Sequence, residues 1–353
     1  MLKKILASPV DWFILCIPIA LVIIGIITIY TITYPDYHFK LALDQLIFAS
    51  LGLVVMATLM FTNYRAFSSV AWLLYAGGII LLALLVPPLA SKLPFIHTVY
   101  GSNRWINIGF FQLQPSEVFK FLGIIAASAY LARSYVLFGL KKAALYLLII
   151  ALPLIMVLVE PNLGTTAVLM VIFGAMFLAA KPPMRLVAII AALIIVAIPI
   201  IFLNLKPYQR TRVDTFLNPQ ADPQGQGYNV RQALIAVGSG GLTGQGFGQG
   251  TQTVLNFLPV PHSDFIFAGF AEATGFLGAA TLLVLYGVLL WRIIVVAQIS
   301  EDPFGRFIAI GVAAKIFFQV VIHVGMNIGL LPVTGIPLPF MSYGGTAIII
   351  DLA

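Results

Sequence analysis

The sequence predicts an all-α, polytopic integral membrane protein. Of its 353 residues, 61% belong to the hydrophobic set and only 9% are charged, whereas an average soluble domain is roughly 45–50% apolar and about 25% charged. The hydrophobic residues form long runs rich in Leu, Ile and Ala, without the alternation that membrane-spanning strands require. Because each crossing needs about 20 apolar residues, the chain accommodates about ten transmembrane helices and little else.

Ten hydrophobic runs, bounded by charged residues, Pro or Gly, follow one another along the chain. They cover residues 12–33, 45–62, 70–91, 116–134, 143–159, 164–180, 185–204, 265–297, 306–329 and 342–353. The first run follows Lys3 and Lys4, but it is too long for the apolar part of a signal peptide and lacks a small-residue cleavage site, so we expect a permanent helix. The last run is short for a span, which predicts that the sequence stops inside this helix.

The positions of Lys and Arg predict the orientation, because short cytoplasmic loops are enriched in these residues. A cytoplasmic N-terminus places on the inner side Lys3, Lys4, Arg65, Arg133, Lys141, Lys142, Lys181, Arg185, Arg292 and Arg306. The two longest connections, residues 92–115 and 205–263, then face outward. No polar stretch is longer than 205–263, a long loop rich in Gly, Pro and Gln between helices 7 and 8, so residues 1–353 are predicted to form a single transmembrane domain.

Composition and motifs exclude several kinds of site. The single cysteine, Cys16, lies in the first run, which excludes a disulfide framework and a Cys-based metal cluster. The net charge of +7 comes from scattered basic residues rather than the clustered stripe of a nucleic-acid-binding protein. The Gly-rich residues 238–250 contain neither G-x-G-x-x-G nor a following Lys-Ser or Lys-Thr. We therefore expect that the protein binds no nucleic acid, no nucleotide and no organic cofactor. The glycines of residues 238–250 are expected to allow tight turns and close backbone approach.

Glu117 and Lys120 begin the fourth run three residues apart, on one face of the predicted helix. Ionisable groups inside membrane segments are costly and are functional candidates by default. The two side chains can form a structural ion pair, with Glu117 favoured by the helix N-terminus. Alternatively, Lys120 binds a phosphate in a polar cavity and Glu117 holds it in place, and the spacing leaves both interpretations open.

Asp264 directly precedes the eighth run and follows Pro261, His262 and Ser263. This position favours an N-cap, which contributes about 1 kcal/mol. A carboxylate at the membrane interface beside a charged ligand equally suits a general base or a metal ligand. His262 and His323 are further possible ligands, although no set of His, Asp and Glu has sequence-local metal spacing.

Cations in the two long connections are suited to phosphate, because guanidinium groups bind it through paired hydrogen bonds. These arginines are Arg104, Arg210, Arg212 and Arg231. Six cations over the two long connections are not dense, so simple solvation is the alternative. Glu160, Glu272 and Lys315 are single ionisable residues at or within spans, and a neighbouring helix can satisfy each. An enzyme acting on lipid-linked substrates, a transporter of an anionic amphiphile and a membrane scaffold all fit these observations.

Four motifs occur in order over nearly the whole chain. They are GSNRWI at 101–106 with QPSEVFK at 114–120, GSGG at 238–241, FLPVPHSDFIFA at 257–268, and PLPFMSYGG at 337–345. Together they resemble the SEDS family (shape, elongation, division and sporulation). Within it, residues 248–252 leading into 256–259 are more similar to the RodA elongation branch than to the FtsW division branch.

The resemblance implies a peptidoglycan glycosyltransferase that polymerises lipid II into glycan strands on the outer face of the bacterial cytoplasmic (inner) membrane during cell elongation. It also implies a divalent cation, Mg or Mn, and as partners a class B penicillin-binding protein and the elongation machinery. Asp264 matches the essential aspartate of the family, which overrides the N-cap interpretation and suggests a general base, with undecaprenyl diphosphate as leaving group. The expected substrate-binding residues are Lys120, Glu117, Arg104, Arg210, Arg212, Ser263 and His262.

Two positions depart from the family pattern. Asn162 stands where related sequences usually have Asp, and Ala273 follows Glu272 where a second Glu is usual, so we expect no charged role at 162 and only Glu272 as an acidic candidate in the eighth helix. Two alternatives remain. A lipid II flippase needs access from both faces, whereas the polar residues here cluster on one, and a non-catalytic scaffold for a penicillin-binding protein would leave Asp264 dispensable.

Overall fold

The computed structural model describes residues 11–87, 89–99, 102–109, 111–134, 138–160, 162–203, 207–218 and 225–353. The first half of the chain contains α2 (Trp12–Tyr37), α3 (Lys40–Met60), α4 (Ala66–Ala83), η1 (Ala90–Lys92), β1 (Ile96–Val99), β2 (Ser102–Ile108), β3 (Phe111–Leu113), α5 (Pro115–Ser134), α6 (Leu140–Val159) and α7 (Leu163–Ala179). The second half contains α8 (Met184–Leu203), α9 (Pro207–Leu217), α10 (Gln226–Ser239), α11 (Thr251–Val254), α12 (Ile266–Ile299), α13 (Pro303–Asn327) and α14 (Gly345–Leu352).

The predicted hydrophobic runs are helical. Within the described residues, six helices are long and apolar enough to cross a membrane, namely α2, α3, α4, α6, α12 and α13. The remaining four runs correspond to α5, α7, α8 and α14. The chain is thus a multi-pass helical membrane protein, and the count of ten crossings stays a prediction because α7 has 17 residues and α14 has eight.

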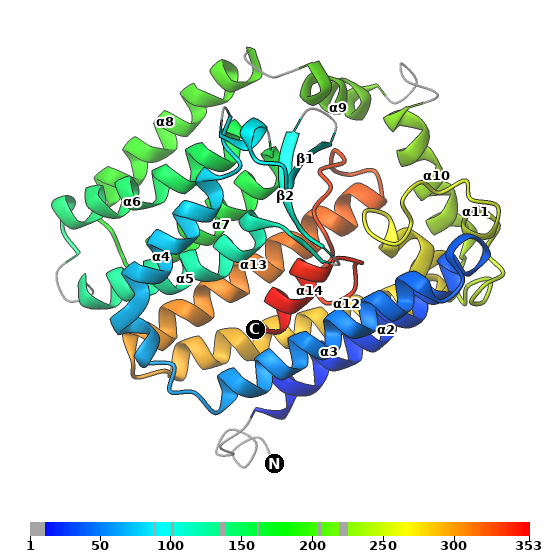
Figure 1. Cartoon of the computed structure of the whole chain (residues 1–353), viewed down its shortest axis with the longest axis horizontal. Coiled ribbons are helices and arrows are strands. Elements are labelled where there is room, and N and C mark those ends of the chain that lie inside the picture. The colour runs from blue at the N-terminus through cyan, green and yellow to red at the C-terminus, as the bar shows by residue number, and fades with distance from the viewer. Residues whose placement is uncertain are drawn as a thin grey trace.

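Helix α13 lies at the centre of the bundle and packs against α5, α7 and α12 (Figure 1). On one side, its Ile316 and Val320 join a core shared with α2, α12 and α14. On the other side, its Phe307 joins a second core built by α5, α6 and α7. α13 therefore connects two packed halves, and its buried polar residues lie between them.

The connection between α4 and α5 corrects the all-α prediction. It forms a small antiparallel sheet in the order β1-β2-β3, in which Ile106 is paired with Ile96 on one side and with Leu113 on the other. Ile96 and Ile106 are buried with Leu85 and Ala90, and this small core anchors the sheet to the end of α4. In β2 only Ile106, Asn107 and Ile108 alternate in polarity, so neither a long hydrophobic run nor an extended alternation marks the strand in the sequence.

The segment 205–263 is not a simple loop, because three helices, α9, α10 and α11, lie within it. The glycines that follow α10 approach the backbone of α12 closely, as the sequence predicted. A Cβ on Gly244 would lie 2.2 Å from the carbonyl oxygen of Ala273, and the amide of Gly246 donates a 3.0 Å hydrogen bond to that oxygen. Gly275 has φ +67° and breaks the helical geometry of α12 at this contact.

Candidate functional site

Two cavities meet at Asp264. The first, of about 480 Å³, is lined by the three cations Arg104, Lys120 and Arg212 and is called the cation cavity below. The second, of about 500 Å³, lies beside β2 and β3 and is called the sheet-side cavity. Their walls share Trp105, Gln114, Ser263, Asp264, Gly335 and Pro337. Asp264 is therefore accessible from both sides.

The backbone at Asp264 is held by α13 rather than by a cap that Asp264 provides. Phe265 is the N-cap residue of α12, and no side chain caps that end, so the N-cap prediction from spacing is wrong. Instead, Asn327 Nδ2 donates to the carbonyl oxygen of Asp264 at 3.1 Å, and Asn327 Oδ1 accepts from the amide of Ala268 at 3.0 Å. This leaves the Asp264 carboxylate available to the two cavities.

The Asp264 carboxylate is half-buried and accepts a 3.1 Å hydrogen bond from Ser263 Oγ. Burial raises its pKa, while the Ser263 hydroxyl and the Arg212 guanidinium act in the opposite direction. A carboxylate with a raised pKa is a stronger base once ionised. The nearby Arg212 cation favours the charged form of the carboxylate, which is the state a base needs.

Glu117 and Lys120 form a buried ion pair in the wall of the cation cavity. Lys120 Nζ lies 2.6 Å from Glu117 Oε2, and the two side chains are 1% and 2% exposed. The geometry is compatible with both interpretations of the sequence: the two side chains form a buried ion pair, and Lys120 also lines the cation cavity. An anionic ligand in this cavity would find Lys120 already fixed in position.

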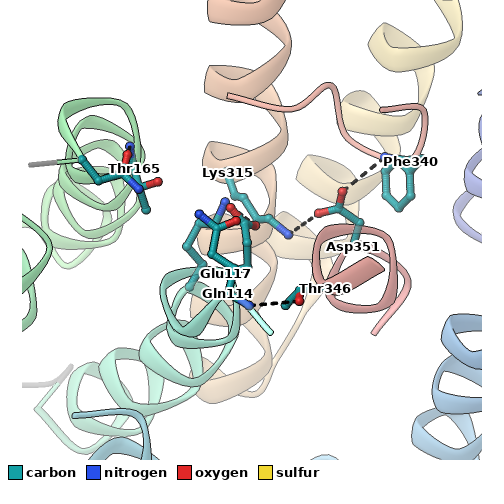
Figure 2. A network of polar contacts seen from close by, with 9 residues as sticks. Gln114, Glu117, Thr165, Lys315, Phe340, Thr346 and Asp351 are labelled. Atoms are coloured by element: carbon teal, nitrogen blue, oxygen red, sulfur yellow. Dashed lines mark hydrogen bonds and ion pairs between the residues drawn. The ribbon is translucent and has the colours of Figure 1, made fainter. Parts of the chain in front are cut away.

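A second buried ion pair lies beside the first. Lys315 Nζ on α13 is 2.5 Å from Asp351 Oδ1 on α14, and Asp351 Oδ2 accepts from the amide of Phe340 at 3.2 Å. Figure 2 shows these groups near Glu117, together with the bond from the Gln114 amide to Thr346 Oγ1. Lys315 is thus satisfied by a neighbouring helix, as expected, and links α13 to the segment that carries the last motif.

The predicted arginines separate into two groups. Arg104 on β2 and Arg212 on α9 line the cation cavity. Arg210 and Arg231 are exposed on α9 and α10 and line neither of the two cavities. The structure therefore brings Arg104 and Arg212 together with Lys120 and leaves Arg210 outside this group.

His262 and His323 have different surroundings. His262 lines the sheet-side cavity, with its ring 5.5 Å from the Tyr343 ring in an edge-on arrangement, and burial lowers its pKa. His323 is buried on α13, where Nδ1 lies 2.8 Å from the carbonyl oxygen of Ile336, and it lines neither cavity. Of these two histidines, His262 is the one that can contact a ligand in the sheet-side cavity.

The motifs at 257–268 and 337–345 are joined by hydrogen bonds. Ser342 Oγ donates to the carbonyl oxygen of Ser263 at 2.9 Å and accepts from the amide of Leu338 at 2.8 Å. Gln45 on α3 donates to the carbonyl oxygen of Ser342 at 3.1 Å and accepts from the amide of Gly344 at 3.2 Å. These bonds fix the wall of the site around Asp264.

Glu272 and Asn162 each bind backbone amides at the start of a helix, and Glu160 is a buried carboxyl group. Glu272 accepts hydrogen bonds from the amides of Gln252 and Thr253, at 2.8 and 3.1 Å, and so satisfies the start of α11. Asn162 caps α7 by accepting from the amide of Thr165 at 3.2 Å, a task for which an amide oxygen suffices. Glu160 is buried at the end of α6, and burial raises its pKa to about 8 against the opposing charge of Arg104.

Three residues of this region were not singled out from the sequence: Gln45, Asn327 and Asp351. Each acts on a segment distant in the chain, so local spacing gave no signal for its partner. Lys315 offered the one available clue, because a buried lysine in a membrane helix requires an anionic partner. Asp351 is the carboxylate that meets this need.

The donor set for a divalent cation is limited. Within the described part of the chain, no group of three or more His, Cys, Asp and Glu side chains is arranged to hold a metal ion. Asp264 is the carboxylate common to both cavities. Mg²⁺ is commonly bound by one or two carboxylates together with substrate phosphates, and the residues present fit that mode rather than an all-protein site.

Comparison with known proteins identifies the family. A family model described as "Cell cycle protein", which groups FtsW, RodA and SpoVE, matches residues 9–353. The chain belongs to the FtsW/RodA/SpoVE family. It is 37% identical to the peptidoglycan glycosyltransferase MrdB of Escherichia coli K12, over 86% of this chain and 80% of that protein. It is 33% identical to the stage V sporulation protein E of Bacillus subtilis, over 97% and 94%.

Two solved structures have the same architecture as this chain. A chain from "Structural coordination of polymerization and crosslinking by a peptidoglycan synthase complex" matches with a TM-score of 0.81 and 29% identity, over 98% of this chain and 95% of that one. The rod shape determining protein RodA of Thermus thermophilus matches with a TM-score of 0.72 and 26% identity, over 98% and 94%. The SEDS resemblance and its RodA-like character are confirmed, and the chain is a peptidoglycan glycosyltransferase.

Proposed function

We propose that this enzyme polymerises lipid II into glycan strands on the outer face of the bacterial cytoplasmic membrane during cell elongation, with Asp264 as general base. The observation that carries the proposal is the junction of two cavities at Asp264, one of them lined by three cations. A transfer between two lipid-linked sugars needs two binding sites that meet at the reacting atoms. Asp264 occupies that meeting point.

The cation cavity suits the donor. When the C4 hydroxyl of the acceptor attacks the anomeric carbon of the donor, the bond from that carbon to the diphosphate breaks and negative charge develops on undecaprenyl diphosphate. Arg104, Lys120 and Arg212 would stabilise this charge as it forms. Glu117 would hold the Lys120 ammonium at the cavity wall.

The sheet-side cavity suits the acceptor. A sugar here would lie among Trp105, Gln112 and His262, which offer an aromatic face and hydrogen-bonding groups. Asp264 would accept the proton of the C4 hydroxyl as the new glycosidic bond forms, directly or through water. The product would stay attached to the lipid carrier of the acceptor. The proton would leave through the sheet-side cavity.

A divalent cation, Mg or Mn, would be held by Asp264 together with diphosphate oxygens of the substrate. When bound, it would neutralise part of the charge of the leaving group. Asp264 would still orient the acceptor, and the three cations would still bind the phosphates. Addition and removal of Mg²⁺ or Mn²⁺ in the polymerisation assay tests this part.

The charge distribution supports the proposed location, and the family supports the proposed partners. We place the N-terminus in the cytoplasm, which puts the ends of α5 and α12 that form the site on the outer side. The solved complex that this chain resembles coordinates polymerisation and crosslinking, which supports a class B penicillin-binding protein as partner. The RodA-like relatives support a role with the elongation machinery.

Glycan formation from purified lipid II, with the cognate penicillin-binding protein present, tests the proposal. We expect polymer from the wild type and from Asp214→Asn, which makes the same chemical change at an exposed position on α9. We expect none from Asp264→Asn. Polymer from neither the wild type nor Asp264→Asn, in folded and intact complexes, would favour a flippase or a scaffold instead.

A further inference from the structure

A third cavity, of about 740 Å³, lies at the opposite end of the bundle from Asp264. It is lined by the last turns of α7 and α12 and the first half of α13, and we call it the basal groove. Both α7 and α12 pack on α13 (Figure 1), and the space between them is left open by small side chains. These include Ala175 and Ala179 of α7, Ala297 of α12, and Ala313 and Ala314 of α13.

The basal groove faces the membrane side of the protein. Ile294 and Phe317 line it and are 46% and 56% exposed. Along α13 it extends from Arg306 to Phe317, which at 1.5 Å per residue is about 16 Å. That length is roughly half of the about 30 Å hydrocarbon core of a bilayer, so the groove matches the depth of one leaflet.

The end of the basal groove is cationic. Lys181, two residues after the end of α7, and Arg306, the fourth residue of α13, line it together with Gln298. The lining residues include no Asp or Glu among the residues that the structure describes. Arg306 Nη2 donates to the carbonyl oxygen of Ser300 at 2.7 Å, which holds the guanidinium near the end of α12.

Two neighbouring acidic groups have partners that do not line the groove. Asp302 accepts from the amide of Phe304 at 3.2 Å and lies 3.6 Å from Arg65. The N-cap residue of α2, Asp11, pairs with Arg292 on the same face of the bundle. The groove therefore opens at the face where the described chain begins, and two cations line this end of it.

We propose that the basal groove binds an anionic phospholipid of this leaflet, with its phosphate between Lys181 and Arg306 and an acyl chain along α13. The cations, the apolar walls and the one-leaflet length each match one part of such a lipid. A polyprenyl tail descending from the Asp264 cavities would instead place its apolar end against the two cations. Charge complementarity therefore favours the phospholipid over the substrate tail.

Native mass spectrometry of the full chain, released from micelles doped equally with phosphatidylglycerol and phosphatidylcholine of matched chains, tests the proposal. The wild type is expected to retain phosphatidylglycerol preferentially. The Lys181→Gln/Arg306→Gln variant should retain it about thirtyfold less, since each of the two cations near an anionic headgroup contributes about 1 kcal/mol. The Lys141→Gln/Lys142→Gln variant, which removes the same charge at the start of α6 outside the groove, should behave as the wild type.

Two further variants keep the test independent of folding. Lys181→Gln alone leaves the Arg306–Ser300 bond intact, and Ala314→Phe fills the groove without changing charge. Both should lower phosphatidylglycerol retention while the melting temperature without lipid stays near that of the wild type. Equal retention of the two lipids by the wild type would overturn the proposal. So would unchanged retention in these variants, or displacement of phosphatidylglycerol by undecaprenyl phosphate at equal concentration.

Discussion

The Glu117–Lys120 pair can be tested for structure and for chemistry separately. Lys120→Met leaves a buried Glu117 carboxylate unpaired, which should destabilise the protein by about 3–5 kcal/mol. The double variant Glu117→Gln/Lys120→Met removes both charges, so we expect it to recover most of the melting temperature. If Lys120 binds the diphosphate, polymerisation should stay low in both variants.

Melting temperatures and polymerisation rates of the two variants, measured on the same preparations, decide between the two roles. Recovery of both stability and polymerisation in the double variant would show that the pair is structural only. Glu301→Gln serves as the control, because it removes one negative charge at an exposed position outside the cavities.

Glu160 should make stability depend on pH. Its pKa is about 8 in the folded protein against an ordinary value of 4.5, so between these values the folded state holds a proton that the unfolded state has lost. Stability therefore falls as pH rises from about 4.5 to 8, by up to about 1.4 kcal/mol per pH unit for this group. Glu160→Gln removes the dependence.

We expect the melting temperature of Glu160→Gln to exceed that of the wild type by an amount that grows from pH 5 to pH 8. The two proteins should converge near pH 4.5. A difference that is constant over this range, or that shrinks as pH rises, would show that Glu160 is ionised in the folded protein.

At the scale of elements, α11 depends on a carboxylate from another helix. The helix has four residues, and Glu272 of α12 binds its first amides, while a Cβ on Gly250 would lie 2.4 Å from the Glu272 carboxylate. Glu272→Ala leaves these amides buried and unpaired, at about 1–3 kcal/mol each. We expect faster hydrogen exchange confined to residues 250–258, with Glu301→Ala as the unaffected control.

The positions of the long helices could be predicted from the sequence, because continuous apolar runs leave few alternatives in a membrane. The sheet between α4 and α5 was missed, since β2 is short and its pairing with β1 and β3 gives only a brief alternation. The helices α9 and α10 were missed because a segment rich in Gly, Pro and Gln favours turns. Tertiary packing of α10 against α12 overrides that preference.

At the scale of the whole molecule, the sequence predicted that Asp264, Lys120 and Arg104 lie at the outer side of the bundle, but it gave no distances between them. The two cavities depend on how α5, α12 and α13 pack, which no local pattern encodes. The bond from Asn327 to the Asp264 backbone joins residues 63 positions apart in the chain, and the Lys315–Asp351 bond joins residues 36 apart. Such contacts follow from the fold, and the resemblance to the SEDS family supplied the importance of Asp264 in advance.

Asp264 is proposed to act as a base at the junction of two binding sites. The most direct test measures lipid II binding and turnover in parallel for the wild type and Asp264→Asn, each in complex with the penicillin-binding protein. A general base contributes about 10²–10⁴-fold, so we predict turnover lowered by at least about a hundredfold with lipid II affinity within about threefold of the wild type. Turnover within about threefold of the wild type at unchanged affinity would contradict a base role for Asp264.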